Sequence, residues 1–334
     1  MMREGAPKTI YRKDYTESDF LISHVELAFE IADGNTRVTS SLRMQRNGSH
    51  ERPLVLDGEG LGLISVSVDG GTLEEGAFKY VGGKLTVDTV PDEFEFGAVV
   101  DIQPETNTSL EGLYRSRTMY CTQCEAEGYR KITFGLDRPD VLSTYTVTLS
   151  ADKASCPVLL SNGNEVSRTD LADGRHQVVW HDPHPKPSYL FAIVAGDLEL
   201  VSDTFTTQSG KVVDLRIWVE AKDTGYCDHA MDSLKASMRW DEERYGLEYD
   251  LDLFNIVAVD DFNMGAMENK SLNIFNTSCV LAHPDITTDL GYQRVESVVA
   301  HEYFHNYSGN RVTCRDWFQL SLKEGFTVFR DAEF

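Results

Sequence analysis

Alternation of apolar and polar residues recurs from about residue 20 to about residue 220, and it restricts this part of the chain to β-structure. Four runs show the alternation most clearly, at residues 25–31, 64–68, 145–149 and 213–219. Turn-forming clusters such as Asp69-Gly70-Gly71 separate the runs. Successive side chains of a β-strand point to opposite faces of a sheet, so this period indicates strands with one buried face. The pattern predicts an N-terminal antiparallel all-β domain, built as a large curved sheet or a sandwich.

The spacing of the apolar residues changes beyond residue 220. Ala230, Leu234 and Met238 lie four residues apart with charged residues between them, and Gly246 follows as a helix stop. A mainly apolar run further on is typical of a buried strand. These patterns predict a helix over residues 227–246, a buried strand over 251–259, and two more helices over 291–308 and 316–334, the first of these two ending at Ser308-Gly309-Asn310.

The length of the chain and the position of this change predict two domains. The chain has 334 residues, more than the roughly 100–200 residues of a typical domain. We place the boundary near Asp197, which gives an N-terminal β domain over residues 1–197 and a second domain, with strands and helices, over residues 198–334. The predicted fold class is therefore multidomain α+β.

Net charge and composition exclude several classes of partner. The chain has 31 Lys and Arg residues and 54 Asp and Glu residues, a net charge of −23. A surface this acidic repels phosphate backbones and anionic lipid heads, so we expect neither a nucleic-acid nor a membrane partner. The sequence has no run of about 20 apolar residues to cross a bilayer, and no apolar secretory segment near its N-terminus. Six cysteines are too few for a disulfide scaffold, which favours reduced thiols and a cytoplasmic protein.

His301-Glu302-Tyr303-Phe304-His305 is the first motif that carries chemistry. On a helix, residues i and i+4 share one face, so both imidazoles can reach the same metal ion. Glu302 is turned about 100° around the helix axis from His301, which places it beside the metal, where a general base for an attacking water is needed. Two histidines at this spacing without a metal stay an alternative, because the H-E-x-x-H pattern also arises by chance.

Glu324 is the candidate for a third metal ligand. It lies early in the next predicted helix. Two histidines and one carboxylate leave the fourth position of a tetrahedral zinc ion open for water, as catalysis requires. Ser321-x-x-Glu324 also fits a capping box, in which the glutamate would serve only the helix N-terminus. We favour the ligand, because a cap does not account for the H-E-x-x-H motif that precedes it.

A second motif, Gly265-Ala266-Met267-Glu268-Asn269, precedes His301. In this order and spacing, the motifs resemble those of the M1 family of zinc aminopeptidases, which are gluzincins. The stretches at residues 121–128 and 317–325 are similar to the bacterial aminopeptidase N branch of that family. The resemblance covers essentially the whole chain and implies a β domain followed by the first part of a thermolysin-like α/β catalytic domain. M1 chains are normally far longer, so we expect this chain to be an N-terminal fragment, truncated on the C-terminal side of the catalytic domain.

The resemblance implies a role for each matching residue. His301, His305 and Glu324 would bind one zinc ion, and Glu302 would activate the attacking water. Gly265, Ala266, Met267, Glu268 and Asn269 would lie along the substrate backbone. Glu268 would hold the free α-ammonium of the substrate together with Gln123 and Glu125, and Met264 would line the pocket for its first side chain. Carboxylates in a poorly hydrated pocket bind such a cation through charge-assisted hydrogen bonds.

The leading prediction is a metallo-aminopeptidase that hydrolyses N-terminal residues from peptides with a free N-terminus. Two alternatives are a non-catalytic fragment that binds zinc or a peptide, and a thermolysin-like endopeptidase. The motif at residues 265–269 argues against the endopeptidase, which has no free amine to anchor. In the family, a tyrosine that stabilises the oxyanion lies beyond Phe334, so we expect the 334-residue chain by itself not to be a competent peptidase.

Overall fold

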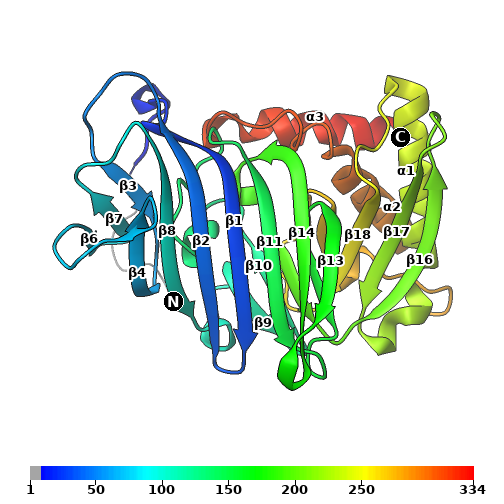
Figure 1. Ribbon diagram of the computed structural model, residues 1–334. Coiled ribbons are helices and arrows are strands. Elements are labelled where there is room, and N and C mark those ends of the chain that lie inside the picture. The colour runs from blue at the N-terminus through cyan, green and yellow to red at the C-terminus, as the bar shows by residue number, and fades with distance from the viewer. Residues whose placement is uncertain (1–8) are drawn as a thin grey trace.

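A computed structural model describes residues 9–334, which form four β-sheets and three α-helices (Figure 1). Three sheets make up one side of the molecule, and the fourth sheet and the helices gather on the other (Figure 1). Short 3-10 helices connect these elements, at Arg12–Asp14, Pro104–Thr106, Tyr129–Lys131, Ala172–Gly174, Ser188–Leu190, Ala221–Tyr226, Thr277–Cys279 and Trp317–Gln319. Within residues 9–334, the helices are either too short or too polar to cross a bilayer.

The largest sheet has eight strands in the order β13-β14-β11-β1-β2-β8-β4-β5. The strands are β1 (Phe20–Ala32), β2 (Asn35–Arg46), β4 (Gly62–Val68), β5 (Gly71–Thr72), β8 (Glu93–Ile102), β11 (Ser143–Asp152), β13 (Asn164–Asp170) and β14 (Arg175–Lys186). Neighbouring strands pair antiparallel, with the exception of β1 and β11, which are parallel. The predicted antiparallel β-structure is confirmed, apart from this one pairing.

The predicted alternation agrees with burial in most of these strands. In β1, the four apolar residues of the run 25–31 are buried, and the residues between them are exposed or half-buried. Strand β4 departs from the pattern, because Val66 is buried while Ile64 is 49% exposed. Among the described residues, only the two-residue β5 lies beyond β4 in the sheet, so this end has less structure to pack against.

Two smaller sheets complete the N-terminal part, in the orders β12-β15-β10-β9 and β3-β7-β6. Their strands are β3 (Leu54–Asp57), β6 (Lys79–Val81), β7 (Lys84–Val87), β9 (Gly112–Ser116), β10 (Met119–Gln123), β12 (Val158–Ser161) and β15 (Ile193–Gly196). Their apolar side chains join those of the largest sheet in one buried core. Strand β10 ends at Gln123, so this core fixes the start of the segment that carries Gln123 and Glu125.

The fourth sheet has five strands in the order β16-β17-β18-β20-β19. They are β16 (Glu199–Thr206), β17 (Val212–Val219), β18 (Leu253–Val259), β19 (Ala266–Met267) and β20 (Leu272–Asn276). The three inner strands are parallel, and the two edge strands are antiparallel to their neighbours. The change from β15 to β16 lies close to the predicted boundary at residue 197, and the division into two domains stays a prediction.

Strand β18 is buried at every residue, as predicted for the run at 251–259. Val257 and Val259 pack into the core of the N-terminal sheets. Ile256 and Ala258 point to the other face, where they join a second core with the helices. A strand that is covered on both faces needs apolar residues at consecutive positions, which explains the continuous run.

The helices are α1 (Asp228–Tyr245), α2 (Asp289–Phe304) and α3 (Leu320–Glu333). Helix α1 stops at Gly246, which adopts a left-handed conformation with φ of 69°, as its predicted role as a stop requires. The side chain of Thr288 accepts a hydrogen bond from the backbone N–H of Gly291 and starts α2. The predicted end of this helix at residues 308–310 is wrong. Helix α2 ends at Phe304. The chain then folds back, and the backbone N–H of Asn310 donates a hydrogen bond to the carbonyl of His305 (3.0 Å).

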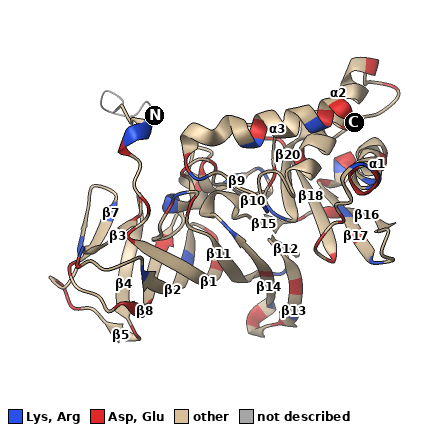
Figure 2. Cartoon of the chain, turned by 90° about the horizontal axis from the view of Figure 1, so that it is seen from above, with Lys and Arg blue, Asp and Glu red and all other residues tan. Residues whose placement is uncertain are grey.

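The excess acidic charge is spread over the molecule. Figure 2 shows Asp and Glu along both the sheets and the helices instead of in one patch. Several acidic residues are nevertheless buried beside a basic partner, and one of these pairs holds α3 in place.

Arg330 on α3 links that helix to α1 and α2. Its guanidinium pairs with Asp241 on α1 and donates to the carbonyl of Phe304 on α2 (2.8 Å). The side chain is only 1% exposed. We expect Arg330→Met to lower the free energy of unfolding by about 3–5 kcal/mol, because Asp241 would stay buried without its partner. Chemical denaturation measures the difference, with the exposed Arg239→Met on α1 as a matched control. Equal stability of the two variants would contradict the expectation.

Candidate metal centre and carboxylate pocket

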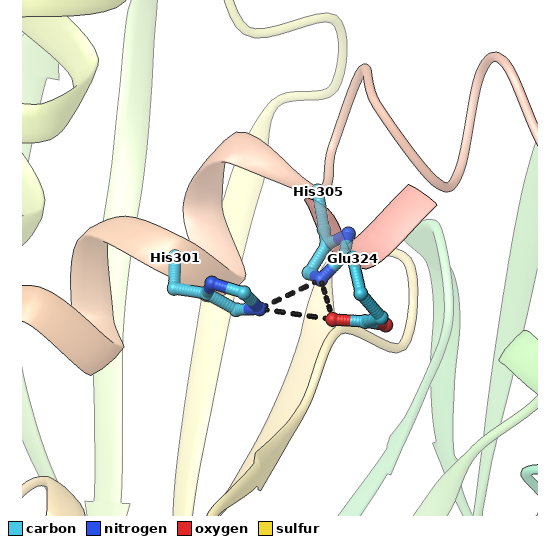
Figure 3. Close-up of side chains that lie close together, drawn as sticks. All are labelled: His301, His305 and Glu324. Carbon is cyan, nitrogen blue, oxygen red and sulfur yellow. Dashed lines mark hydrogen bonds and ion pairs between the residues drawn. The ribbon is translucent and has the colours of Figure 1, made fainter. Parts of the chain in front are cut away.

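Three side chains converge at the C-terminal end of α2 (Figure 3). His301 lies on α2, His305 directly follows its last residue, and Glu324 lies on α3. The Nε2 atoms of the two histidines are 3.0 Å apart, and they lie 3.2 Å and 3.3 Å from Glu324 Oε2. Ligand atoms around a tetrahedral ion with bonds of about 2.0 Å are about 3.3 Å apart. The three atoms are therefore spaced as three ligands of one small metal ion would be.

The start of α3 tests the capping-box alternative for Glu324. Helix α3 begins at Leu320, so Ser321 lies inside the helix, and no side chain of residues 9–334 caps the helix N-terminus. The capping-box alternative is therefore wrong. The carboxylate of Glu324 instead lies within hydrogen-bond distance of Nε2 of both histidines.

Each histidine ring is held by a partner on its other nitrogen. His301 Nδ1 lies 2.7 Å from Asp331 Oδ2, and His305 Nδ1 lies 2.8 Å from the backbone carbonyl of Ser308. Such partners fix the orientation of a metal-binding imidazole and leave Nε2 free for the metal. The sequence reasoning missed Asp331. It lies two helical turns after Glu324 on the same face of α3, and that spacing is the signal that could have found it.

The charges of these groups are coupled. Burial raises the pKa of Glu324, but the hydrogen bonds from His301 and His305 outweigh burial and hold the pKa well below its usual range. Burial lowers the pKa of His301, but the hydrogen bond to Glu324 and the neighbouring charges raise it to about 9. Metal binding would then release a proton from His301 at neutral pH, because an imidazole ligand must be deprotonated.

Glu302 lies beside the candidate metal-binding atoms, which are Nε2 of His301, Nε2 of His305 and Oε2 of Glu324. The side chain is buried, and its Oε2 atom has no hydrogen-bond partner among residues 9–334. A carboxylate oxygen of Glu302 lies within 4.8 Å of ligand atoms of Glu268 and His305. Burial, followed by the charge of Glu268, raises the pKa of Glu302 well above its usual value. A carboxylate with a raised pKa and a free oxygen next to a metal centre is suited to accept a proton.

Glu125, Glu268 and Glu324 form a carboxylate pocket next to the metal-binding atoms, with one oxygen of each within 4.8 Å of the others. The ammonium of Lys323 lies in this pocket. Its Nζ is 2.9 Å from Glu125 Oε1 and 2.8 Å from Glu324 Oε1, and it pairs with Glu268 Oε1. Lys323 is almost completely buried. The sequence reasoning missed it, because a lysine next to a glutamate on a helix is typical of a solvent-exposed face.

The pKa values of the two carboxylates predicted to hold a substrate ammonium are shifted in opposite directions. Burial and the nearby charge of Glu268 raise the pKa of Glu125 to about 7. Burial also raises the pKa of Glu268, but the charge of Lys323 outweighs it and lowers that pKa below its usual value. Buried carboxylates this close together stay ionised only with a cation beside them. The pocket is therefore built to bind a positive charge.

Residues 264–269 lead from the edge of the five-stranded sheet into this pocket. Within the described residues, β19 is the last strand of the sheet and pairs with β20 alone. The other edge of such a strand can bind an extended peptide through its backbone. Met264 is 38% exposed, and its Sδ accepts a hydrogen bond from Gln123 Nε2 (2.8 Å).

The structure brings the predicted histidines and glutamates together, and it places Gln123 against Met264 and Met267. Several of their buried polar atoms have no hydrogen-bond partner among the described residues, namely Gln123 Oε1, Glu302 Oε2 and both side-chain polar atoms of Asn269. Buried polar groups are nearly always paired, so such a cluster indicates a place where a ligand completes the hydrogen bonds. The metal and substrate roles of these residues remain predictions.

Nearly the whole chain is similar to known peptidases. Residues 22–190 match the family model of the peptidase M1 N-terminal domain, and residues 229–334 match that of the peptidase family M1 domain. The chain is 54% identical to aminopeptidase N of Caulobacter vibrioides over 330 residues, and 53% identical to aminopeptidase N of Escherichia coli over 328 residues. These matches include 99% and 98% of the chain but 38% of each relative.

A solved structure shares the fold. The crystal structure of Legionella pneumophila aminopeptidase A in complex with aspartic acid superposes with a TM-score of 0.93 at 39% identity, over 96% of this chain and 38% of that one. The chain therefore spans little more than a third of the length of the relatives it matches.

Proposed function

Because the chain belongs to peptidase family M1, we propose that it carries the metal-binding and amine-binding parts of an aminopeptidase site that removes N-terminal residues from peptides. One observation carries the proposal: Glu125 and Glu268 hold an ammonium, that of Lys323, directly beside the metal-binding atoms. Lys323 contacts the Oε1 atoms of these carboxylates, and their Oε2 atoms have no hydrogen bond to another described residue. The α-ammonium of a peptide would use these remaining oxygens.

We infer that the metal is zinc. Two imidazole nitrogens and one carboxylate oxygen, spaced 3.0–3.3 Å apart, match a tetrahedral site with an open fourth position. When bound, zinc would polarise the scissile carbonyl and lower the pKa of a water molecule.

The residues of the chain supply the remaining steps. Glu302 would accept the proton of the attacking water and donate it to the leaving amine. Glu268 and Glu125 would hold the α-ammonium through charge-assisted hydrogen bonds, with Gln123 completing this site. Residues 265–269 would align the substrate backbone, and Met264 would contact its first side chain.

We also propose that the protein works in the cytoplasm on peptides with a free N-terminus. All six cysteines are buried and none is in a disulfide, which is typical of a reducing compartment. That these 334 residues by themselves are not a competent peptidase stays a prediction. The activity assays below therefore use the chain extended to the length of its relatives.

Cleavage is expected to depend on a free N-terminus. A peptide that begins with leucine should lose one residue at a time, whereas its N-acetylated form should stay intact, because acetylation removes the charge that Glu268 and Glu125 bind. Mass spectrometry of the products over time makes the comparison.

Glu302→Gln protein prepared in the same way excludes a contaminating peptidase. Cleavage of both peptides at similar rates, or products cut at internal bonds, would contradict the amine site and restore the endopeptidase alternative.

A further inference from the structure

We propose that Lys270 is a positioning residue that fixes the distance between the carboxylate pocket and the metal-binding atoms. The inference rests on the proposed function, because this distance matters only if one substrate contacts both places. In the N-terminal residue of a peptide, a single Cα separates the ammonium from the scissile carbonyl. Glu268 and the metal must therefore be held at a spacing that fits one residue.

The loop at residues 305–310, which follows α2, contacts both the metal ligand His305 and Glu268 of the carboxylate pocket. The carbonyl of Ser308 orients His305, as described above, and the side chain of Asn310 donates to the carbonyl of Glu268 (2.8 Å). Gly309 between them has φ of 147°, and a Cβ atom there would lie 2.7 Å from His305 Nδ1. The loop is thus closely fitted to the metal ligand at one end and to Glu268 at the other.

Lys270 makes a second link between the same two places. It follows Glu268 by two residues, and its Nζ donates to the side-chain oxygen of Asn306 (2.7 Å), the residue after His305. The same ammonium pairs with Asp250 (2.5 Å). The backbone carbonyl of Lys270 accepts a hydrogen bond (2.8 Å) from Asn162, which lies between β12 and β13. Side chain and backbone of Lys270 are therefore both anchored.

The burial of Lys270 needs an explanation, because an apolar residue could fill this space without the cost of desolvating a charge. Only 1% of the residue is exposed. Its contacts do not extend a sheet or helix; they join the segment that ends in the carboxylate pocket to the end of the metal-binding helix. A displacement of about 1 Å between reacting groups can reduce a rate about 100-fold. A role in fixing the distance between Glu268 and the metal-binding atoms would explain why a lysine is buried here.

Two probes measure the spacing directly. Leucine hydroxamate and 4-methylpentanoic hydroxamate both chelate zinc and differ only in the α-amino group. We measure both dissociation constants calorimetrically on the zinc-loaded chain and divide that of the probe without the amine by that of leucine hydroxamate. This ratio reports how well the ammonium is held once the hydroxamate is on the metal. We expect Lys270→Met to reduce this ratio by roughly 10- to 100-fold. Binding of the probe without the amine, and zinc affinity measured against a chelator, should not change.

Lys186→Met is the matched control. Lys186 is equally buried and pairs with Asp182 (3.0 Å), but it lies on β14 and has no hydrogen bond to residues 264–270. Asn306→Ala removes the acceptor of Lys270 and keeps the pair with Asp250, and it serves if Lys270→Met does not fold. A reduced ratio in Lys270→Met or Asn306→Ala, but not in Lys186→Met, supports the proposal.

Three outcomes would overturn it. An unchanged ratio in the folded variants would show that Lys270 does not set the spacing. An equal reduction in Lys186→Met would show a general effect of losing a buried charge. Equal binding of the two probes by the unsubstituted chain would refute the amine site itself, and this result identifies a failure of the proposed function as distinct from a failure of the positioning role.

Discussion

His305→Ala is expected to abolish metal binding. The side chain of His305 is buried, and its Nε2 lies within 3.3 Å of both other metal-binding atoms. Loss of a partner outside the ligand set typically reduces metal affinity by about 10- to 100-fold, so loss of one of three ligands should reduce it by more. Elemental analysis after dialysis should find one zinc per chain in the unsubstituted protein and none in the variant.

His176→Ala is the matched control for this experiment. His176 is as deeply buried as His305, and its ring bonds to the backbone carbonyl of Cys156 far from the metal-binding atoms in the sequence. It should keep its zinc. Equal zinc content in His305→Ala and the unsubstituted protein would remove His305 from the ligand set.

Glu302→Gln is expected to keep zinc and lose most of the turnover. The amide has nearly the same shape as the carboxylate but cannot accept a proton, and loss of a general base typically costs about 10²–10⁴-fold in rate. The free and buried Oε2 of Glu302 is the atom that would take the proton. Steady-state hydrolysis of leucine p-nitroanilide, measured at equal zinc content in the extended chain, gives the ratio of rates.

The same substitution at Glu296 controls for the change of charge on α2. Glu296 is an exposed residue of the same helix, so Glu296→Gln should retain its rate. Near-normal turnover of a zinc-loaded Glu302→Gln protein would show that another group is the base.

Local pattern was sufficient to predict most elements of this fold. The alternation at residues 25–31 predicts the buried face of β1, and Gly246 ends α1 because it can adopt a left-handed conformation. The parallel pairing of β1 with β11 was not predictable, because each strand shows the same alternation whichever strand lies beside it. The true end of α2 depends on the contact between Asn310 and His305, which is a property of the folded loop.

The site was predictable where helical spacing brings residues together. His301 and His305 lie four residues apart, so their convergence follows from the sequence. Glu324 was predicted because two histidines and one carboxylate are a typical ligand set of catalytic zinc. Lys323 and Lys270 were not found, because a buried lysine cannot be distinguished from an exposed one without the contacts that neutralise it. Those contacts come from carboxylates distant in the sequence, Glu125 for Lys323 and Asp250 for Lys270.

Crystals of the zinc-loaded chain, with diffraction data collected on both sides of the zinc absorption edge, test the central claim most directly. An anomalous difference map locates zinc independently of any assumption about its ligands. We expect one strong peak at about 2.0–2.2 Å from His301 Nε2, His305 Nε2 and a carboxylate oxygen of Glu324. A map without a peak at these three residues, or with its strongest peak elsewhere, would contradict the proposed metal centre.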